Sequence, residues 1–222
     1  MGRVLLPSRG PDDWKQFLAQ PDLHWKTGYS ARTLAHSWER AKTIPPEVAA
    51  IMSEAFGRSD LLFAVPEHKT TLPGGGRESQ SDVFALVRHP GGLACYTIEG
   101  KVDEPFGPTV GEWSVGASPG KIERLAHLCS ILGLPSCPTD IRYQLMHRTM
   151  SALTEADRFD AKLAGIIVHS FSPDRRSYDE FVRFGALLGC KIELGRASIL
   201  KLPSGKSLVM GWASGDQTFR AA

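Results

Sequence analysis

Asp82, Glu99 and Lys101 are the residues whose types and spacing indicate chemistry, because sixteen residues separate Asp82 from the Glu-Gly-Lys sequence at 99–101. Two carboxylates that face each other repel unless a cation lies between them. Lys101 compensates for part of this repulsion, and a divalent ion bridging both carboxylates would compensate more fully. Mg²⁺ typically takes one or two carboxylates, retains several waters and meets a substrate phosphate. The pattern therefore indicates a metal site for chemistry on phosphate groups.

A predicted β-hairpin brings the three side chains together. The strand-like segments 82–88 and 93–101 flank a His-Pro-Gly-Gly turn. A turn centred on its Pro–Gly pair matches residues whose numbers sum to 181, so Asp82 lies opposite Glu99. Lys101 shares the face of Glu99 because side chains alternate along a strand. The alternative is a weak surface salt-bridge cluster, since a change of one residue in the turn would move Asp82 to the other face.

The arrangement of Asp82 and the Glu-Gly-Lys sequence at 99–101 resembles the D…(D/E)-x-K signature of the PD-(D/E)XK nuclease superfamily, which has the restriction-endonuclease-like fold. The order of elements expected over residues 46–170 is similar to the core of that superfamily: helix, strand, Asp-bearing strand, E-x-K strand, helix, strand. The sequence IEGKVDEPFG at 98–107 resembles an uncharacterised bacterial family within it. One departure is Ser81, where the signature has Pro.

The resemblance implies a metal-dependent catalytic site. Asp82 and Glu99 would bind Mg²⁺ or Mn²⁺ together with the carbonyl oxygen of Gly100. Lys101 would orient or deprotonate the attacking water and help to stabilise the charge that develops on the phosphate. A metal ion in such a site polarises the phosphoryl group and lowers the pKa of its bound water.

Members of this superfamily often carry a further acid on the helix that precedes the core. Glu54 and Glu47 are the candidates here, and Glu39 is more remote. We take Glu54 as the fourth metal ligand. The alternative for each of the three is a solvated charge on a helix surface.

The predicted helix that starts near Asp140 carries a polar stripe, with Gln144, His147, Arg148 and Ser151 at i, i+3, i+4 and i+7. The simpler interpretation of this stripe is a solvent-exposed face. In the superfamily that the chain resembles, the helix after E-x-K often places a Gln or a basic residue beside the metal. The resemblance therefore adds Gln144 to the catalytic set and makes Arg148 a phosphate contact.

A working nuclease needs a site that is open to a polymer. We therefore expect a groove beside Lys101, flanked by basic side chains, with Arg142, Arg148 and Lys121 as the nucleic-acid contacts. A groove lined with carboxylates would instead favour a non-catalytic nuclease-like fold that binds a protein or nucleic acid. The sequence leaves open whether the substrate is DNA or RNA, and whether the protein forms a homodimer.

The remaining elements predict a mixed α/β chain that forms one domain. Residues 1–58 have helical patterns and form an N-terminal extension. Residues 59–171 form the nuclease-like core, a mixed β-sheet flanked by helices over 119–132 and about 140–157. Its first strand is expected over 61–65, and residues 103–116 are expected to be irregular. Residues 172–222 add a helix and a C-terminal β-hairpin. The apolar segment 161–170 is typical of a strand buried on both faces of a sheet.

Composition excludes several classes of protein. The chain has 222 residues, is 42% hydrophobic and has a net charge of +2, so any contact with nucleic acid must be local. No apolar run approaches the roughly 18 residues of a membrane span, and Pro7 interrupts the start before a signal-peptide region forms. Cys95, Cys129, Cys137 and Cys190 have apolar neighbours and lack metal-site spacing, which predicts buried, reduced thiols. We therefore expect a cytoplasmic protein without a membrane partner.

Overall fold

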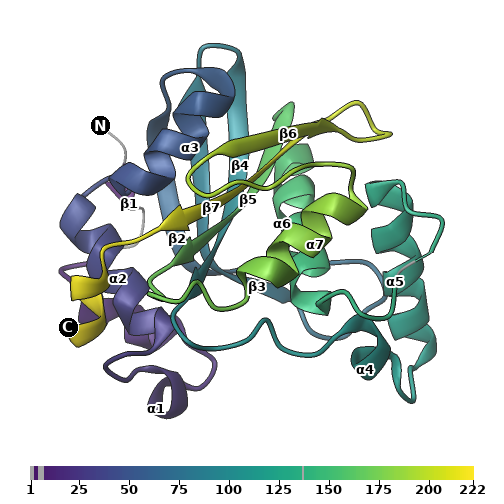
Figure 1. The fold of residues 1–222 in the computed structure, drawn as a ribbon, viewed down its shortest axis with the longest axis horizontal. Coiled ribbons are helices and arrows are strands. Elements are labelled where there is room, and N and C mark those ends of the chain that lie inside the picture. The colour runs from purple at the N-terminus through teal and green to yellow at the C-terminus, as the bar shows by residue number, and fades with distance from the viewer. Residues whose placement is uncertain (1–2, 5–7, 137) are drawn as a thin grey trace.

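The computed structural model describes residues 3–4, 8–136 and 138–222. Pro7 and Cys137, both named above, lie outside this part. Within the described residues, seven strands form a single sheet in the order β1-β2-β3-β4-β5-β7-β6 (Figure 1). The strands are β1 (Arg3–Val4), β2 (Asp60–Thr70), β3 (Ser79–His89), β4 (Gly92–Lys101), β5 (Leu163–Ser170), β6 (Ala197–Lys201) and β7 (Ser207–Ser214).

The sheet is mixed, as predicted. Strands β2, β3 and β4 form an antiparallel meander, and β5 then adds to β4 in the parallel direction. The C-terminal hairpin of β6 and β7 is antiparallel, and its second strand β7 pairs in parallel with β5. The last strand of the chain therefore lies inside the sheet, and β6 and β1 form its two edges.

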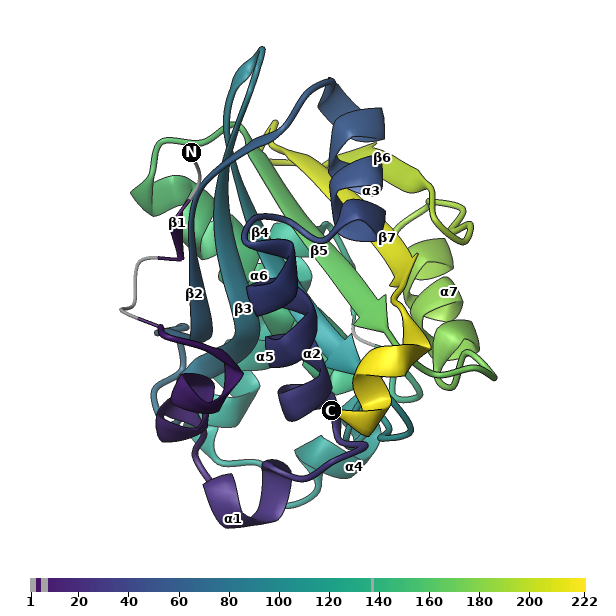
Figure 2. The same ribbon diagram turned by 90° about the vertical axis from the view of Figure 1, so that its left-hand side faces the viewer.

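Helices cover both faces of the sheet, as the two views in Figure 1 and Figure 2 show. The helices α2 (Ser30–Ala41) and α3 (Pro46–Phe56) cover one face. The opposite face carries α6 (Tyr143–Arg158) and α7 (Tyr178–Leu187), with α5 (Pro119–Leu132) packed beside α6. Short helices complete the chain: η1 (Pro11–Phe17), α1 (Pro21–His24), α4 (Val110–Ser114) and η2 (Gln217–Ala221).

Local sequence explains where α5 begins and ends. The Ser118 side chain accepts a hydrogen bond from the Lys121 N–H at 3.4 Å, and Pro119 occupies the first helical position. At the other end Gly133 has a φ of 71°, a left-handed conformation that closes helices and favours glycine. The predicted helix over 119–132 is confirmed.

The strand β5 is buried along its whole length. All eight of its residues are buried, because α3 with its neighbours covers one face of the sheet and α6 covers the other. This explains why the segment lacks the alternation of polar and apolar residues of a half-exposed strand. The prediction of a strand buried on both faces is confirmed.

Four features differ from the expectations. Helix α6 begins at Tyr143 and not near residue 140, and β2 continues to Thr70. The region after β4 contains α4, which starts with a capping box in which the Thr109 side chain accepts from the Glu112 N–H. Cys129 is disulfide-bonded, so the prediction of a reduced thiol is wrong for this residue. None of the described helices is long and apolar enough to cross a membrane.

Candidate active site

The β3–β4 hairpin has the predicted register. Its backbone pairs run from Val83 opposite Ile98 to His89 opposite Gly92, and each pair sums to 181. The side chains of Glu99 and Lys101 lie on the face covered by α6, where Glu99 contacts Arg148. That face of the sheet also carries Asp82.

Asp82 stands just beyond the last backbone pair of the hairpin. Its Oδ2 accepts the N–H of Gly100 at 2.8 Å, so the side chain continues the hairpin where the backbone pairing stops. Its Oδ1 lies 3.9 Å from Arg148 Nη2. Burial and the nearby Glu99 carboxylate raise the pKa of Asp82 to about 7, against the opposing effects of Arg148 and Lys101.

Glu99 is the centre of a buried polar network and is 2% exposed. Its Oε1 accepts from Lys101 Nζ at 2.8 Å and from Gln144 Nε2 at 2.6 Å. Its Oε2 accepts from Arg148 Nε at 2.8 Å. Burial by itself would raise the pKa of Glu99, but the charges of Lys101 and Arg148 outweigh it and hold the pKa below its usual range.

Glu67 is the site residue that the sequence did not reveal. The pairs Pro66 opposite Val83 and His68 opposite Ser81 bracket Glu67 and Asp82, so these two lie side by side on β2 and β3. Glu67 has a left-handed φ of 52° and accepts from Gln80 Nε2 at 2.8 Å.

The pKa of the Glu67 carboxyl is raised, like that of Asp82. Burial and the Asp82 carboxylate raise the pKa of Glu67 to about 8. The sequence predicts a strand that ends at Val65, and Glu67 lies beyond it, so Glu67 was not among the predicted site residues. The presence of an acidic residue two positions after that expected end is the signal that could have revealed it.

These side chains line a cavity of about 340 Å³, which we call the carboxylate pocket. Among its lining residues are Glu67, Asp82, Glu99, Lys101, Gln144 and Arg148. Residues of the N-terminal segment, among them Leu18, Tyr29 and Ser30, form another wall. Glu104 also lines the pocket and accepts the Ser30 N–H at 2.8 Å, which ties this wall to the loop after β4.

The pocket is richer in acids than the expected nucleic-acid groove. Four carboxylates, from Glu67, Asp82, Glu99 and Glu104, line it together with the cations Lys101 and Arg148. Lys101 is only 5% exposed, and its ammonium also lies 4.9 Å from the ring centre of Phe106. The expectation of a basic groove around Lys101 is therefore wrong for the side chains that line this pocket.

The donor set is chemically suited to a hard divalent cation. Mg²⁺ prefers oxygen ligands and is typically held by one or two carboxylates. Asp82 and Glu99 meet this requirement. Burial, followed by a neighbouring carboxylate, raises the pKa of Asp82 and of Glu67, and a bound cation would favour the charged forms of these acids. Within the described residues, no three His, Cys, Asp or Glu side chains form a ready-made metal site. Binding of a divalent cation would therefore use the two carboxylates of Asp82 and Glu99, and it would weaken the interaction between Arg148 and Glu99.

The expected nucleic-acid contacts lie in three different settings. Arg148 is 8% exposed and points inward to Glu99. Arg142 donates to Glu180 at 2.7 Å and to the Gly107 carbonyl, so its guanidinium belongs to the loop after β4 and does not line the carboxylate pocket. Lys121 lines a second pocket, in contact with Trp113.

The structure does not bring Glu54 to the carboxylate pocket. Helix α3 packs on the opposite face of the sheet, where Glu54 pairs with Arg196 and accepts the Ala197 N–H. Glu47, on the same helix, pairs with His169 at 2.6 Å. Glu39 accepts from the indole N–H of Trp14. The expectation that Glu54 completes the metal site is therefore corrected, because α3 covers the other face.

Comparison with known proteins assigns the chain to a family. A family model described as a domain of unknown function (DUF6946) matches residues 7–217, so the chain belongs to that family. Searches of the curated proteins and of the solved structures found no match.

Proposed function

We propose that this member of the DUF6946 family is a metal-dependent nuclease that hydrolyses phosphodiester bonds with Mg²⁺ or Mn²⁺ in the carboxylate pocket. The observation that carries the proposal is the common face of Asp82, Glu99 and Lys101 at the end of the β3–β4 hairpin. The order α3-β2-β3-β4-β5, with α4, α5 and α6 between β4 and β5, also supports a restriction-endonuclease-like core.

Each residue of the pocket has a role in this proposal. Asp82 and Glu99 would hold the cation, with the Gly100 carbonyl as a further oxygen ligand. When bound, the cation supplies polarisation of the phosphoryl group and a lower pKa for a coordinated water. The Lys101 ammonium would orient the attacking water and stabilise the charge that develops on phosphate. Gln144, 3.4 Å from Lys101 and 2.6 Å from Glu99, would hold both groups in place.

Arg148 lies close to both carboxylates of the proposed metal site. Its guanidinium touches Glu99 and approaches Asp82, and so supplies the positive charge that separates the two carboxylates. A guanidinium can also donate two parallel hydrogen bonds to a phosphate. We infer that Arg148 turns from Glu99 to the substrate phosphate when a cation takes over the neutralisation of the carboxylates.

A non-catalytic nuclease-like fold is the second candidate, and a specific observation favours it. Both oxygens of Glu99 already accept hydrogen bonds from Lys101, Gln144 and Arg148. Carboxylates also outnumber cations along the pocket. A network satisfied in this way stabilises the fold without a metal, and the protein would then act by binding a protein or a nucleic acid.

A cleavage assay separates the two candidates. Purified protein is incubated with single-stranded and double-stranded DNA and RNA in Mn²⁺, beside the variants Lys101→Ala and Lys69→Ala. Lys69 is an exposed lysine on β2 and gives a matched loss of charge outside the pocket. Cleavage by the wild type and Lys69→Ala that is lost in Lys101→Ala supports the nuclease.

Two outcomes contradict the nuclease. Equal cleavage by all three proteins means a contaminating activity. Absence of cleavage despite calorimetric binding of Mn²⁺ supports the non-catalytic fold.

A further inference from the structure

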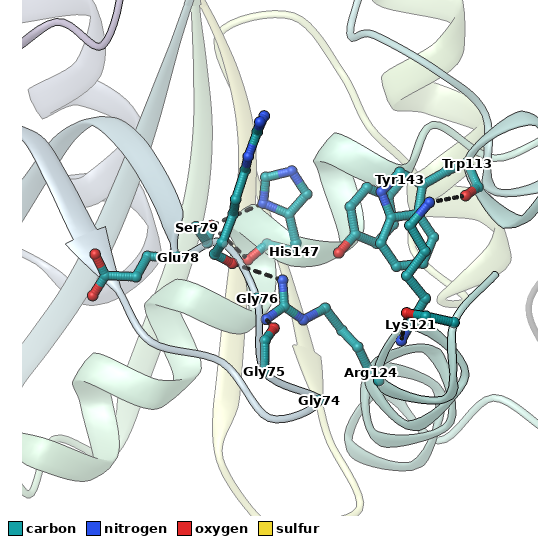
Figure 3. A pocket seen from close by; sticks show the side chains of 13 residues that line it. Gly74, Gly75, Gly76, Glu78, Ser79, Trp113, Lys121, Arg124, Tyr143 and His147 are labelled. Atoms are coloured by element: carbon teal, nitrogen blue, oxygen red, sulfur yellow. Dashed lines mark hydrogen bonds between the residues drawn. The ribbon is translucent and has the colours of Figure 1, made fainter.

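A second pocket, of about 570 Å³, lies between the loop at residues 74–79 and the helices α5 and α6 (Figure 3). We call it the glycine-loop pocket, and its principal residues are Gly74, Gly75, Gly76, Trp113, Lys121 and His147. We propose that it binds one unpaired nucleotide of a single-stranded nucleic acid, next to the phosphate that enters the carboxylate pocket. This inference rests on the proposed function.

One wall of the pocket is a loop held rigidly by Arg124. The guanidinium donates to the carbonyls of Leu72, Pro73, Gly75 and Arg77. Consecutive left-handed φ values of 84°, 61° and 78° at residues 74–76 make this curl possible and favour glycine at all three positions. With its carbonyls bound to Arg124, the loop is a preformed wall.

The opposite wall is a stack of aromatic rings. Trp113 and Tyr143 stack with ring centres 3.9 Å apart and an interplanar angle of 16°, and His147 follows at 4.8 Å from Tyr143. Lys121 Nζ lies 4.7 Å from the ring centre of Trp113 and donates to the Trp113 carbonyl. A lysine over an indole face is readily replaced, since a base that stacks there gains contact area while the ammonium moves to its phosphate.

His147 adds a neutral hydrogen-bonding group to this wall. Burial, followed by the charges of Arg148 and Arg124, lowers the pKa of His147 well below its usual value. Its Nδ1 lies 2.8 Å from Ser79 Oγ and 3.5 Å from Arg148 Nη1. Because a guanidinium can only donate, we assign Nδ1 as the acceptor and place the ring proton on Nε2. The Nε2–H is then a donor for a nucleotide.

Charge and shape together favour a nucleotide. Arg77, Lys121 and Arg124 line the pocket, and Glu78 is the acid among its lining residues. The volume lies within the range of pockets for small ligands. A basic cavity with a half-buried aromatic face fits a ligand that has both an anion and a flat ring. Such stacking requires a base that is free of its own neighbours, which duplex nucleic acid does not offer.

The two pockets share a wall, which links this ligand to the proposed chemistry. Along α6, Tyr143 and His147 line the glycine-loop pocket, whereas Gln144 and Arg148 line the carboxylate pocket. Arg148 donates both to Ser79, which lines the glycine-loop pocket, and to Glu99, which lines the carboxylate pocket. A strand with a base on Trp113 would thus direct its neighbouring phosphate toward Arg148 and Lys101.

The test measures binding without metal, so that cleavage plays no part. A fluorescein-labelled single-stranded oligonucleotide of mixed sequence, and the duplex that it forms with its complement, are titrated in EDTA and followed by anisotropy. Trp113→Ala should weaken binding of the single strand about tenfold, the size expected for one lost stacking contact, and Trp113→Phe should restore most of it. The duplex should bind more weakly and without dependence on Trp113.

Lys121→Glu provides a second variant, because Trp113 also packs against Tyr143 and its loss could disturb the fold. Lys121→Glu should weaken single-strand binding and reduce its salt dependence, whereas Lys69→Glu on β2 should have little effect. Equal affinities of wild type, Trp113→Ala and Lys121→Glu for the single strand would overturn the inference. The inference would also be overturned if the duplex bound as tightly as the single strand and its binding also depended on Trp113.

The cleavage assay in Mn²⁺ distinguishes this inference from the proposed function. If cleavage depends on Lys101 but single-strand binding is the same in the Trp113 and Lys121 variants as in the wild type, the nuclease proposal is supported and the nucleotide pocket is overturned. Binding that depends on Trp113 without cleavage supports the pocket as the ligand site of a non-catalytic fold and overturns catalysis.

Discussion

Arg148 and Glu99 form a buried ion pair across the layers of the fold: Arg148 Nε on α6 donates to Glu99 Oε2 on β4 at 2.8 Å, and each side chain is almost fully buried. The same guanidinium approaches Asp82 and donates to Ser79. The Arg148 side chain therefore joins the two pockets and compensates for the negative charge of the acids in the carboxylate pocket.

Loss of the Glu99 charge should be strongly destabilising. Glu99→Gln keeps the size of the side chain but leaves Lys101 and Arg148 buried without their shared anion, at an expected cost of about 3–5 kcal/mol in the free energy of unfolding. Urea denaturation measures this loss. Glu193→Gln, which removes an exposed acid paired with Lys191, is the control and should leave the midpoint unchanged. A Glu99→Gln protein as stable as the control would contradict the structural role of the network.

Metal binding should depend on Asp82 and not on Glu54. Mn²⁺ should raise the melting temperature of the wild type, because a ligand that binds the folded state alone stabilises it. Asp82→Asn should reduce that rise, since it removes one of the two carboxylate ligands. Glu54→Gln should respond to Mn²⁺ like the wild type, because Glu54 lies on the opposite face. Thermal denaturation over a series of Mn²⁺ concentrations tests both variants, and an equal response of Asp82→Asn and wild type would refute this metal site.

The metal-free protein should lose stability as the pH rises through the titration of the pocket acids. Asp82 and Glu67 have folded-state pKa values of about 7 and about 8, above those of the unfolded chain. The folded state therefore binds more protons than the unfolded state, and this stability is present below about pH 4 and lost by about pH 8. Between about pH 5 and about pH 8 the urea midpoint should therefore fall, and above about pH 8 the contribution of these two acids should level off. Asp82→Asn should show a smaller fall than the exposed control Asp60→Asn, and identical slopes would contradict the raised pKa values.

Two glycines of the same loop should respond differently to alanine. Both Gly74 and Gly75 have left-handed φ, so alanine costs about 1–2 kcal/mol at either position. A Cβ at Gly74 would also lie 2.3 Å from the Gly120 carbonyl oxygen, whereas a Cβ at Gly75 meets nothing within 4 Å. Gly74→Ala should therefore destabilise the protein by about 1–3 kcal/mol more than Gly75→Ala. Urea denaturation of the two variants compares them, and equal losses would show that the loop can move away from α5.

Local interactions made the hairpin and several helices predictable. The register of β3 and β4 follows from the turn between them, because a short turn fixes which residues pair. Helix α5 is bounded by Ser118 and Gly133, whose preferences act within one helical turn. The common face of Asp82, Glu99 and Lys101 could therefore be predicted from neighbouring residues alone.

Long-range packing decided the rest of the candidate site. Which face α3 covers depends on its docking against the sheet, and this moved Glu54 away from the carboxylates. Glu67 joined the site through the pairing of β2 with β3, whose connecting loop is long and carries no short-turn register signal. The polar stripe of α6 indicated a surface or a site equally well, and only its packing on β4 turned Arg148 inward to Glu99. The sequence by itself thus determined most of the elements and the local register of the β3–β4 hairpin. The tertiary structure decided which charges meet, because burial and Coulomb energy depend on distances between segments that are remote in the chain.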